Sequence, residues 1–169
     1  AARLIAALQA IDPQYGQVAR LQRASGLRVS EAVHLQADLI APDGSRIVLQ
    51  GPGIHTKGGR PRQAPVLPDH QALLIDLREH GLAHADRHVF QQRQSLTAAV
   101  KRATSRLVTQ LGIEAGNGTH SLRKLYANEL FEYLLVEKEL PADEAERLVS
   151  QALGHNRLDV LKAYLSAKA

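Results

Sequence analysis

Several short stretches of the sequence place a cation-capable side chain beside a structural break. Three of them read SGLRVSEAVHL, GTHSLRKLYANEL and ALGHNRLDVLKAY, and a fourth, HTKGG, puts a lysine at a turn. In the second stretch a histidine and an arginine lie three residues apart at an expected helix start, and therefore on one face. The side chains that these stretches supply are Arg28, Lys57, His120, Arg123 and His155.

Tyr164 lies nine residues after His155 and completes a set that fits chemistry on a phosphate. Arginine offers a planar fork for two phosphate oxygens and keeps its charge. The tyrosine hydroxyl would attack phosphorus; since its free pKa is about 10, ionising it at pH 7 costs about 4 kcal/mol. Nearby fixed positive charges lower that cost. A leaving sugar alkoxide needs a proton, for which Lys57 is the best candidate.

These side chains must be held by a mostly helical chain. Residues 46–51 and the run GIHTKGGRPRQAPVLP predict a small hairpin or three-stranded antiparallel sheet. The fold class we expect is mainly α with a small three-stranded antiparallel sheet. The expected helices cover 2–10, 14–25, 68–80, 95–110, 120–136, 141–153 and 158–166, with another starting at VSEAVHLQ.

Capping residues define the expected ends of these helices. Ser30 and Thr119 are candidate N-caps, and Pro141 suits a first helical turn. Gly26, Gly81 and Gly154 are expected to end the helices before them.

Composition indicates one globular domain, with 44% hydrophobic and 22% charged residues among 169. Charge is uneven along the chain. Residues 20–63 hold seven cations and three acids, and residues 87–106 hold five cations and no acid. Residues 132–146 hold six acids and one lysine. The basic segments favour a polyanion such as DNA, although solvated helix faces would give the same pattern.

Several classes of protein are excluded. There is no cysteine, so there is no disulfide framework, thiolate nucleophile or cysteine-ligated zinc. No apolar run reaches membrane-spanning length, and the first residues are too interrupted for a signal peptide. We expect a cytoplasmic protein with no membrane partner. The absence of methionine, including at the first position, indicates a fragment of a longer protein.

The ordered stretches resemble the catalytic domain of the tyrosine recombinases, the phage integrase family. GLRVSEAVHL is similar to the family's first arginine box, with Arg28 and its accompanying acid Glu31. TKGGRPRQAPV resembles the β-hairpin bearing the catalytic lysine, here Lys57. THSLRKLYANEL matches the His-x-Leu-Arg box, and LGHNRLDVLKAY matches the Leu-Gly-His box with its tyrosine nine residues on. The resemblance covers about residues 15 to 166.

The resemblance implies a site-specific recombinase that cuts one DNA strand at a time through a 3′-phosphotyrosine and rejoins it, with no metal, nucleotide or other cofactor. Arg28, Arg123 and His155 would hold the phosphate. His120 would assist proton transfer or phosphate binding, and Glu31 would orient the cluster. Implied partners are a double-stranded recombination site in a bacterial or phage nucleoid and further copies of the protein, as a tetramer on DNA. Further DNA contacts are expected at Arg60, Arg62, Lys101 and Arg102.

The sequence departs from the family pattern in several places. The stretch between Arg123 and His155 is longer than usual, and the excess falls in the acidic segment, where we expect a loop facing a protein neighbour. Lys124 stands where many members have a second histidine. Only five residues follow Tyr164. Members also carry an N-terminal helical DNA clamp and a C-terminal tail. We therefore expect 1–169 to be a single catalytic domain, a fragment that binds DNA weakly.

Each residue also has a simpler structural interpretation. Tyr164 could pack in the core, as we expect for Tyr15, Tyr126 and Tyr133. His155 could cap a helix, and His120 could cap or pack. Arg123 could pair with Glu129, and Arg28 with Glu31 in a surface ion pair. Lys57 could simply be solvated.

Other functions also fit parts of the pattern. His80, His84 and His88 recur every four residues, which invites a metal site, but Gly81 interrupts them and no acidic ligand accompanies them. A type IB topoisomerase relative would share the tyrosine chemistry. A non-catalytic DNA-binding or assembly module would be favoured if the cations were scattered in space instead of converging.

Overall fold

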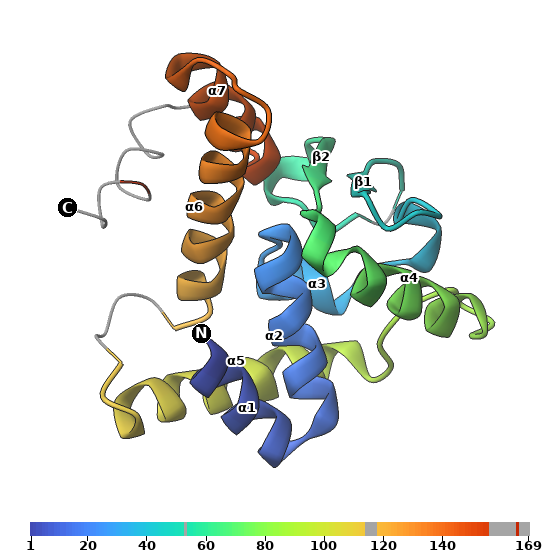
Figure 1. Cartoon of the computed structure of the whole chain (residues 1–169). Coiled ribbons are helices and arrows are strands. Elements are labelled where there is room, and N and C mark those ends of the chain that lie inside the picture. The colour runs from blue at the N-terminus through green and yellow to red at the C-terminus, as the bar shows by residue number, and fades with distance from the viewer. Residues whose placement is uncertain (53, 114–117, 156–164, 166–169) are drawn as a thin grey trace.

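The computed structural model describes residues 1–52, 54–113, 118–155 and 165 (Figure 1). The expected helix 158–166, with its Tyr164, lies outside them except for Leu165. The helices are α1 (Ala2–Ile11), α2 (Pro13–Ser25), α3 (Val29–Val33), α4 (Pro68–Leu82), α5 (Arg93–Gln110), α6 (His120–Val136) and α7 (Ala142–Leu153). The strands are β1 (Arg46–Leu49) and β2 (Arg62–Pro65), and 3₁₀ turns span Ala37–Leu39 and Lys57–Gly59. The mainly helical prediction is confirmed.

The sheet is smaller than expected. Within the described residues β1 pairs antiparallel with β2 alone, from Arg46 opposite Pro65 to Leu49 opposite Arg62. The prediction of a third strand is not confirmed. On the other edge of β1, Ile40 forms only a single bridge with Ile47. Pro42 follows closely and has no N–H for a ladder, so pairing stops there.

Some helix ends differ from the predicted caps. Arg28, not Ser30, is the N-cap of α3, because the Glu31 carboxylate accepts the Arg28 backbone N–H at 2.7 Å. Gly81 lies inside α4 and does not end it. A Cβ at Gly81 would lie 2.8 Å from the Cβ of Ala37, so this glycine permits close packing. Pro141 precedes α7 as its N-cap, and Thr119 makes no side-chain cap bond.

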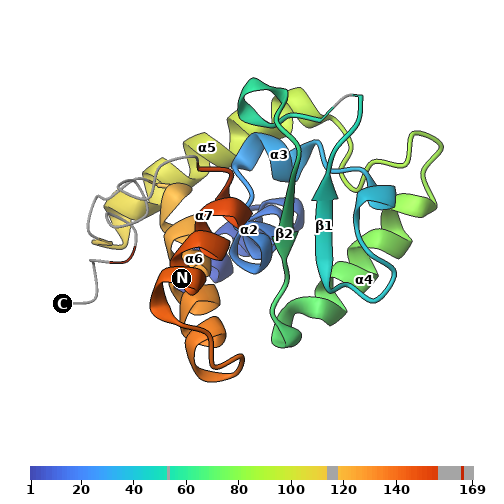
Figure 2. The same cartoon turned by 90° about the horizontal axis from the view of Figure 1, so that it is seen from above.

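Three apolar clusters join the elements. The largest lies between α2, α3, α4, α5 and the sheet, and includes Leu21, Leu35 and Ile47. A second joins α1 to α5 and the start of α6, and a third joins α6 to α7, with Leu165 packed against it. The sheet has α4 beside β1 and α7 beside β2 (Figure 2). Helix α7 contacts β2, and α6 contacts both α2 and α7.

A search for membrane-spanning helices covered only the described residues. None of these helices is long and apolar enough to cross a bilayer.

Candidate active site

Arg123 is the buried centre of the site. It lies in the first turns of α6, is 1% exposed, and donates to the carbonyl oxygens of Gly26 and Leu153. Those carbonyls end α2 and α7, so one guanidinium joins the ends of three helices. Gly26 turns the chain there with φ of +64°, and a Cβ would lie 2.3 Å from the Tyr126 ring. No side chain larger than hydrogen fits this turn without displacing Tyr126.

His155 is brought to Arg123 by the end of α7. Gly154 ends the helix with φ of +69°, in the left-handed conformation expected of a terminal glycine. The backbone N–H of His155 donates to the Ser150 carbonyl at 3.0 Å, and the Ser150 hydroxyl donates to the His155 carbonyl at 2.9 Å. These bonds place the ring Nε2 3.4 Å from Nη2 of Arg123.

Glu31 organises the other side of the site as a buried carboxylate. Its side chain is fully buried and accepts from Nη1 of Arg28 at 3.1 Å and from Nη2 of Arg62 at 2.5 Å. Arg28 and Glu31 therefore form the ion pair considered from the sequence. It is not a surface pair, because the Glu31 carboxylate is buried. Because Glu31 has no exposed surface, its contacts fix where the Arg28 guanidinium lies. Arg28 keeps 26% of its side chain exposed.

Arg62 has different contacts from those predicted. Its side chain is 5% exposed, and it donates to Glu31 and, at 2.8 Å, to the carbonyl of Ala152. A Cβ at Gly154 would lie 2.9 Å from Cδ of Arg62, so the arginine packs directly on the turn before His155. Arg62 thus links β2, α3 and α7, and its DNA contact stays a prediction.

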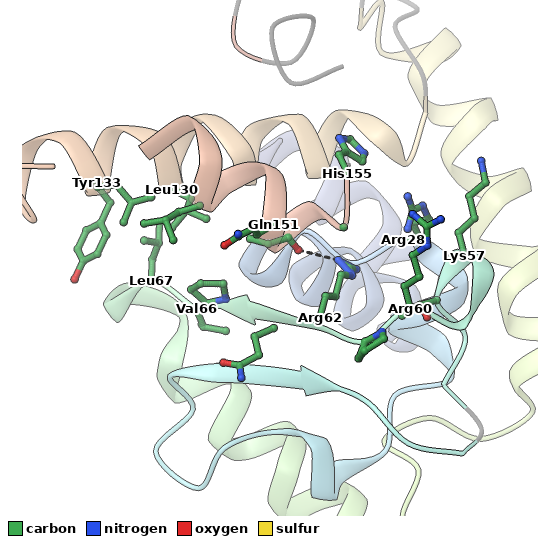
Figure 3. Close-up of a pocket in the computed structure, with 18 of the residues that line it drawn as sticks. Arg28, Lys57, Arg60, Arg62, Val66, Leu67, Leu130, Tyr133, Gln151 and His155 are labelled. Atoms are coloured by element: carbon green, nitrogen blue, oxygen red, sulfur yellow. Dashed lines mark hydrogen bonds between the residues drawn. The ribbon is translucent and has the colours of Figure 1, made fainter. Parts of the chain in front are cut away.

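A cavity of about 670 Å³ opens beside these residues. Arg28, Lys57 and His155 line one end of it, together with Arg60 and Arg62 (Figure 3). Lys57 and Arg60 are exposed and reach the cavity from the loop between the strands. The other end is apolar, and its lining includes Val66, Leu67, Leu130 and Tyr133.

His120 lies on a smaller neighbouring cavity of about 170 Å³, which Arg28, Arg123 and Lys101 also line. The predicted DNA contact Lys101 is therefore next to the catalytic candidates, whereas Arg102, also exposed on α5, lines neither cavity. Five predicted side chains converge here from separate parts of the chain: Arg28, Lys57, His120, Arg123 and His155.

Burial and neighbouring cations lower the pKa of both histidines. Burial, followed by the charges of Arg123 and Arg28, lowers the pKa of His155 to about 4. Burial and the same two arginines also lower the pKa of His120 from its ordinary value. Without an anion, His155 is neutral at pH 7. An anion between the arginines would offset part of their positive charge and raise both pKa values.

The simpler structural interpretations agree with the structure for the described tyrosines but not for Arg123. Arg123 does not form the considered ion pair with Glu129, which Arg23 binds at 2.9 Å. Tyr126 is a buried core residue whose hydroxyl donates to the Pro65 carbonyl at 2.7 Å, and burial raises its pKa. Tyr133 is partly buried on the large cavity, and Tyr15 packs against two of the apolar clusters.

Metal ligation was searched for only within the described residues. Among them no three His, Asp or Glu side chains are placed to hold a metal ion. His84 instead lies with its Nδ1 2.8 Å from the His88 carbonyl oxygen.

Sequence reasoning missed the groups that hold the cations in place. The carbonyls of Gly26 and Leu153 and the hydroxyl of Ser150 belong to helix ends and carry no motif of their own. The glycines at 26 and 154 were visible as breaks, but their role in exposing carbonyls to Arg123 depends on contacts distant in sequence. Tyr164 lies outside the described residues, and its assignment as nucleophile stays a prediction.

Comparisons with known proteins agree with this arrangement. The sequence model described as the phage integrase family matches residues 1–169. Curated protein sequences gave no match.

Solved structures are similar in fold at low sequence identity. A crystal structure of XerA recombinase is 18% identical with a TM-score of 0.66, covering 96% of this chain and 56% of that one. XerH recombinase with its difH substrate is 19% identical with a TM-score of 0.65, covering 95% and 46%. The catalytic domain of bacteriophage HP1 integrase is 22% identical with a TM-score of 0.58, covering 97% and 84%. The chain thus spans about half the length of the XerA and XerH proteins.

Proposed function

Because the chain belongs to the phage integrase family, we propose that it is the catalytic domain of a site-specific DNA recombinase that works through a 3′-phosphotyrosine intermediate. The observation that carries the proposal is the convergence of two arginines, two histidines and a lysine on adjoining cavities. A non-catalytic module has no need to gather these cations around one point. The fold shared with XerA and HP1 integrase supports the same conclusion.

The proposed substrate is double-stranded DNA at a recombination site. The XerH structure of similar fold holds a palindromic difH substrate after cleavage, and the Tn1549 transposon integrase holds transposon DNA. In this chain Lys57, Arg60, Lys101 and Arg102 are exposed cations around the site, so flanking phosphates can reach them. Assembly as a tetramer on DNA, in a bacterial or phage nucleoid, completes the proposal.

In the proposed cleavage step, the Tyr164 oxygen forms a bond to phosphorus while the bond from phosphorus to the 5′ oxygen breaks. The tyrosine hydroxyl gives up its proton, which His120 assists in removing, and Lys57 donates a proton to the departing 5′ oxygen. Arg28, Arg123 and the His155 ring stabilise the charge that develops on the non-bridging oxygens. Glu31 and Arg62 orient these groups.

Rejoining reverses this step, with a 5′-hydroxyl of the second strand as the attacking group. One phosphodiester is exchanged for another, so the bond energy is conserved. The chemistry therefore requires neither a nucleotide nor a metal ion, since the protein's own cations supply the charge stabilisation.

A suicide substrate tests the proposal. Nicked duplexes of randomised sequence, in which cleavage releases a short strand that diffuses away, are incubated with the chain and then denatured. We expect a covalent protein–DNA adduct that survives denaturation. Tyr164→Phe abolishes it, and the matched variant Tyr133→Phe, at a tyrosine on the cavity wall, leaves it unchanged. An adduct that persists in Tyr164→Phe contradicts the assignment of the nucleophile.

The same experiment separates the alternatives. If the chain binds DNA without forming an adduct, and the full-length parent protein also fails to cleave DNA, the non-catalytic module is favoured. Relaxation of supercoiled DNA without sequence preference favours a topoisomerase.

A further inference from the structure

The loop that carries Lys57 is weakly connected to the rest of the protein. It leaves β1 after Leu49 and returns at Arg62, where the paired register resumes. Among the described residues of this loop, the one backbone hydrogen bond is internal, from the Gly59 N–H to the Thr56 carbonyl at 3.0 Å. Residues 54–60 form no hydrogen bond or ion pair with another described element. Hydrogen bonding therefore does not explain how Lys57 is kept at the cavity.

An aromatic contact provides the missing connection. The rings of His34 and His55 are stacked, with centroids 3.9 Å apart and planes 24° from parallel. His55 lies two residues before Lys57, whereas His34 is the C-cap of α3. Nδ1 of His34 lies 2.8 Å from the Ser30 carbonyl, which can only accept, so Nδ1 carries the proton and the ring is held on α3.

The stack therefore joins the loop to the helix that begins at Arg28. That helix also contains Glu31, which binds Arg28 and Arg62. A flat contact at His55 thus fixes the proton-donor candidate relative to the phosphate-binding candidates. Rings that stack in this way contribute to stability beyond the apolar area they bury.

The surroundings of the stack are positively charged. Partial burial, then His34, His88 and Arg93, lower the pKa of His55 from its ordinary value. Asp86 offsets part of this charge, with its carboxylate 2.9 Å from Arg93 and 3.4 Å from His88. Because the pKa of His55 is lower in the docked loop than in the released loop, docking is favoured at high pH, where His55 is neutral. This contribution to docking is lost as pH falls through the lowered pKa.

We propose that His34 and His55 are positioning residues that dock the Lys57 loop against α3, and that acidification releases the loop. The effect on catalysis rests on the proposed function, but docking itself does not. His34 falls within the stretch GLRVSEAVHL and His55 directly precedes TKGGRPRQAPV, but the resemblance assigns neither histidine a role in the site.

Limited proteolysis tests docking without DNA. Trypsin can cut after Lys57 in this loop, whereas the bond after Arg60 resists because Pro61 follows. At pH 8 we expect His55→Ala to be cut after Lys57 roughly three- to tenfold faster than the unmodified chain, the factor expected from losing an aromatic pair. His55→Phe keeps a flat ring and is cut at the unmodified rate. His80→Ala, which removes the α4 ring of the edge-to-face pair between His80 and His84, is the matched control.

Equal cleavage of His55→Ala and the unmodified chain overturns the proposal, and so does equal cleavage of His55→Phe and His55→Ala. The catalytic consequence is measured as the rate of adduct formation between pH 5.5 and 8. His55→Phe should lose less activity than the unmodified chain as pH falls, because its ring cannot be protonated. His120 and His155 are present in both proteins, so their titration cancels in the comparison.

Parallel pH profiles for the two proteins contradict release by acid. If the unmodified chain forms no adduct at any pH, the proposed function fails, and proteolysis alone then decides whether the loop is docked by the stack.

Discussion

The two sides of the site are built differently. Arg123 and Glu31 are buried, and backbone carbonyls and neighbouring guanidinium groups fix their side chains. Lys57 is exposed on a loop that the His34–His55 stack connects to α3. The contrast fits the proposed division of roles, in which the candidate phosphate-binding groups are preorganised by the fold and the candidate proton donor is positioned separately. Preorganised charge is what stabilises a phosphoryl transition state, whereas a proton donor is needed only when the strand leaves.

The buried side of this comparison predicts the largest effect. Arg62→Ala removes one partner of a buried carboxylate and should lower the free energy of unfolding by roughly 3 kcal/mol. Arg60→Ala, two residues earlier and exposed, should change it by less than about 0.5 kcal/mol. Urea denaturation of both variants measures the difference. A stability loss at Arg62 no larger than at Arg60 would mean that the Glu31–Arg62 contact does not brace the site.

On the exposed side, we expect Lys57→Ala to slow single-turnover cleavage by roughly a hundredfold without changing stability, because general acid catalysis is lost. A substrate with sulfur in place of the leaving 5′ oxygen needs no proton on departure, so this variant should cleave it at nearly the unmodified rate. Quenched-flow measurement on both substrates provides the check. A defect that persists with sulfur would show that Lys57 acts elsewhere in the reaction.

The histidines should report the arrival of an anion. The pKa of His155 is about 4 in the free protein, and a phosphate between the arginines should raise it, together with that of His120. DNA binding near pH 5.5 is then accompanied by proton uptake, which declines as pH rises. Calorimetry in two buffers of different ionisation enthalpy measures this uptake. Uptake that is unchanged in His155→Gln would assign the protons to other groups.

The smallest effects are expected at the exposed cations around the site. Lys101→Ala and Arg102→Ala should each weaken DNA binding and reduce the slope of log affinity against log salt by about 0.9 if each side chain contacts one phosphate. Lys101 lines the same cavity as His120, so Lys101→Ala should also slow cleavage slightly, whereas Arg102→Ala should not. Titration of DNA at several salt concentrations gives both slopes, and an unchanged slope at either position removes that contact from the interface.

Much of the fold was predictable because its signals are local. Gly26 and Gly154 mark real helix ends, and the spacing of His120 and Arg123 on one helical turn brings both to the same site. The prediction that Gly81 ends a helix is wrong, because this glycine packs against Ala37, a contact that a local signal cannot reveal. The third strand is not confirmed, because in the run GIHTKGGRPRQAPVLP the residues Lys57–Gly59 form a 3₁₀ turn and only Arg62–Pro65 form a strand.

The sequence predicts side chains that the fold brings together, but not how they are held. The sequence predicts Arg62 as a DNA contact, and only the fold shows that it binds Glu31 and the Ala152 carbonyl. Glu31 was expected to orient the cluster, and it binds both Arg28 and Arg62. The His34–His55 stack joins residues in different elements, and no spacing in the sequence announces it.

The most direct test of the central claim is to locate the covalent bond. The denatured adduct is digested with nuclease and trypsin, and the peptide covering residues 163–168, which contains Tyr164, is examined by mass spectrometry. We predict that this peptide carries a nucleotide linked through its 3′ phosphate to the tyrosine oxygen. A nucleotide on any other residue, or a DNA end with no attached peptide, would contradict the account.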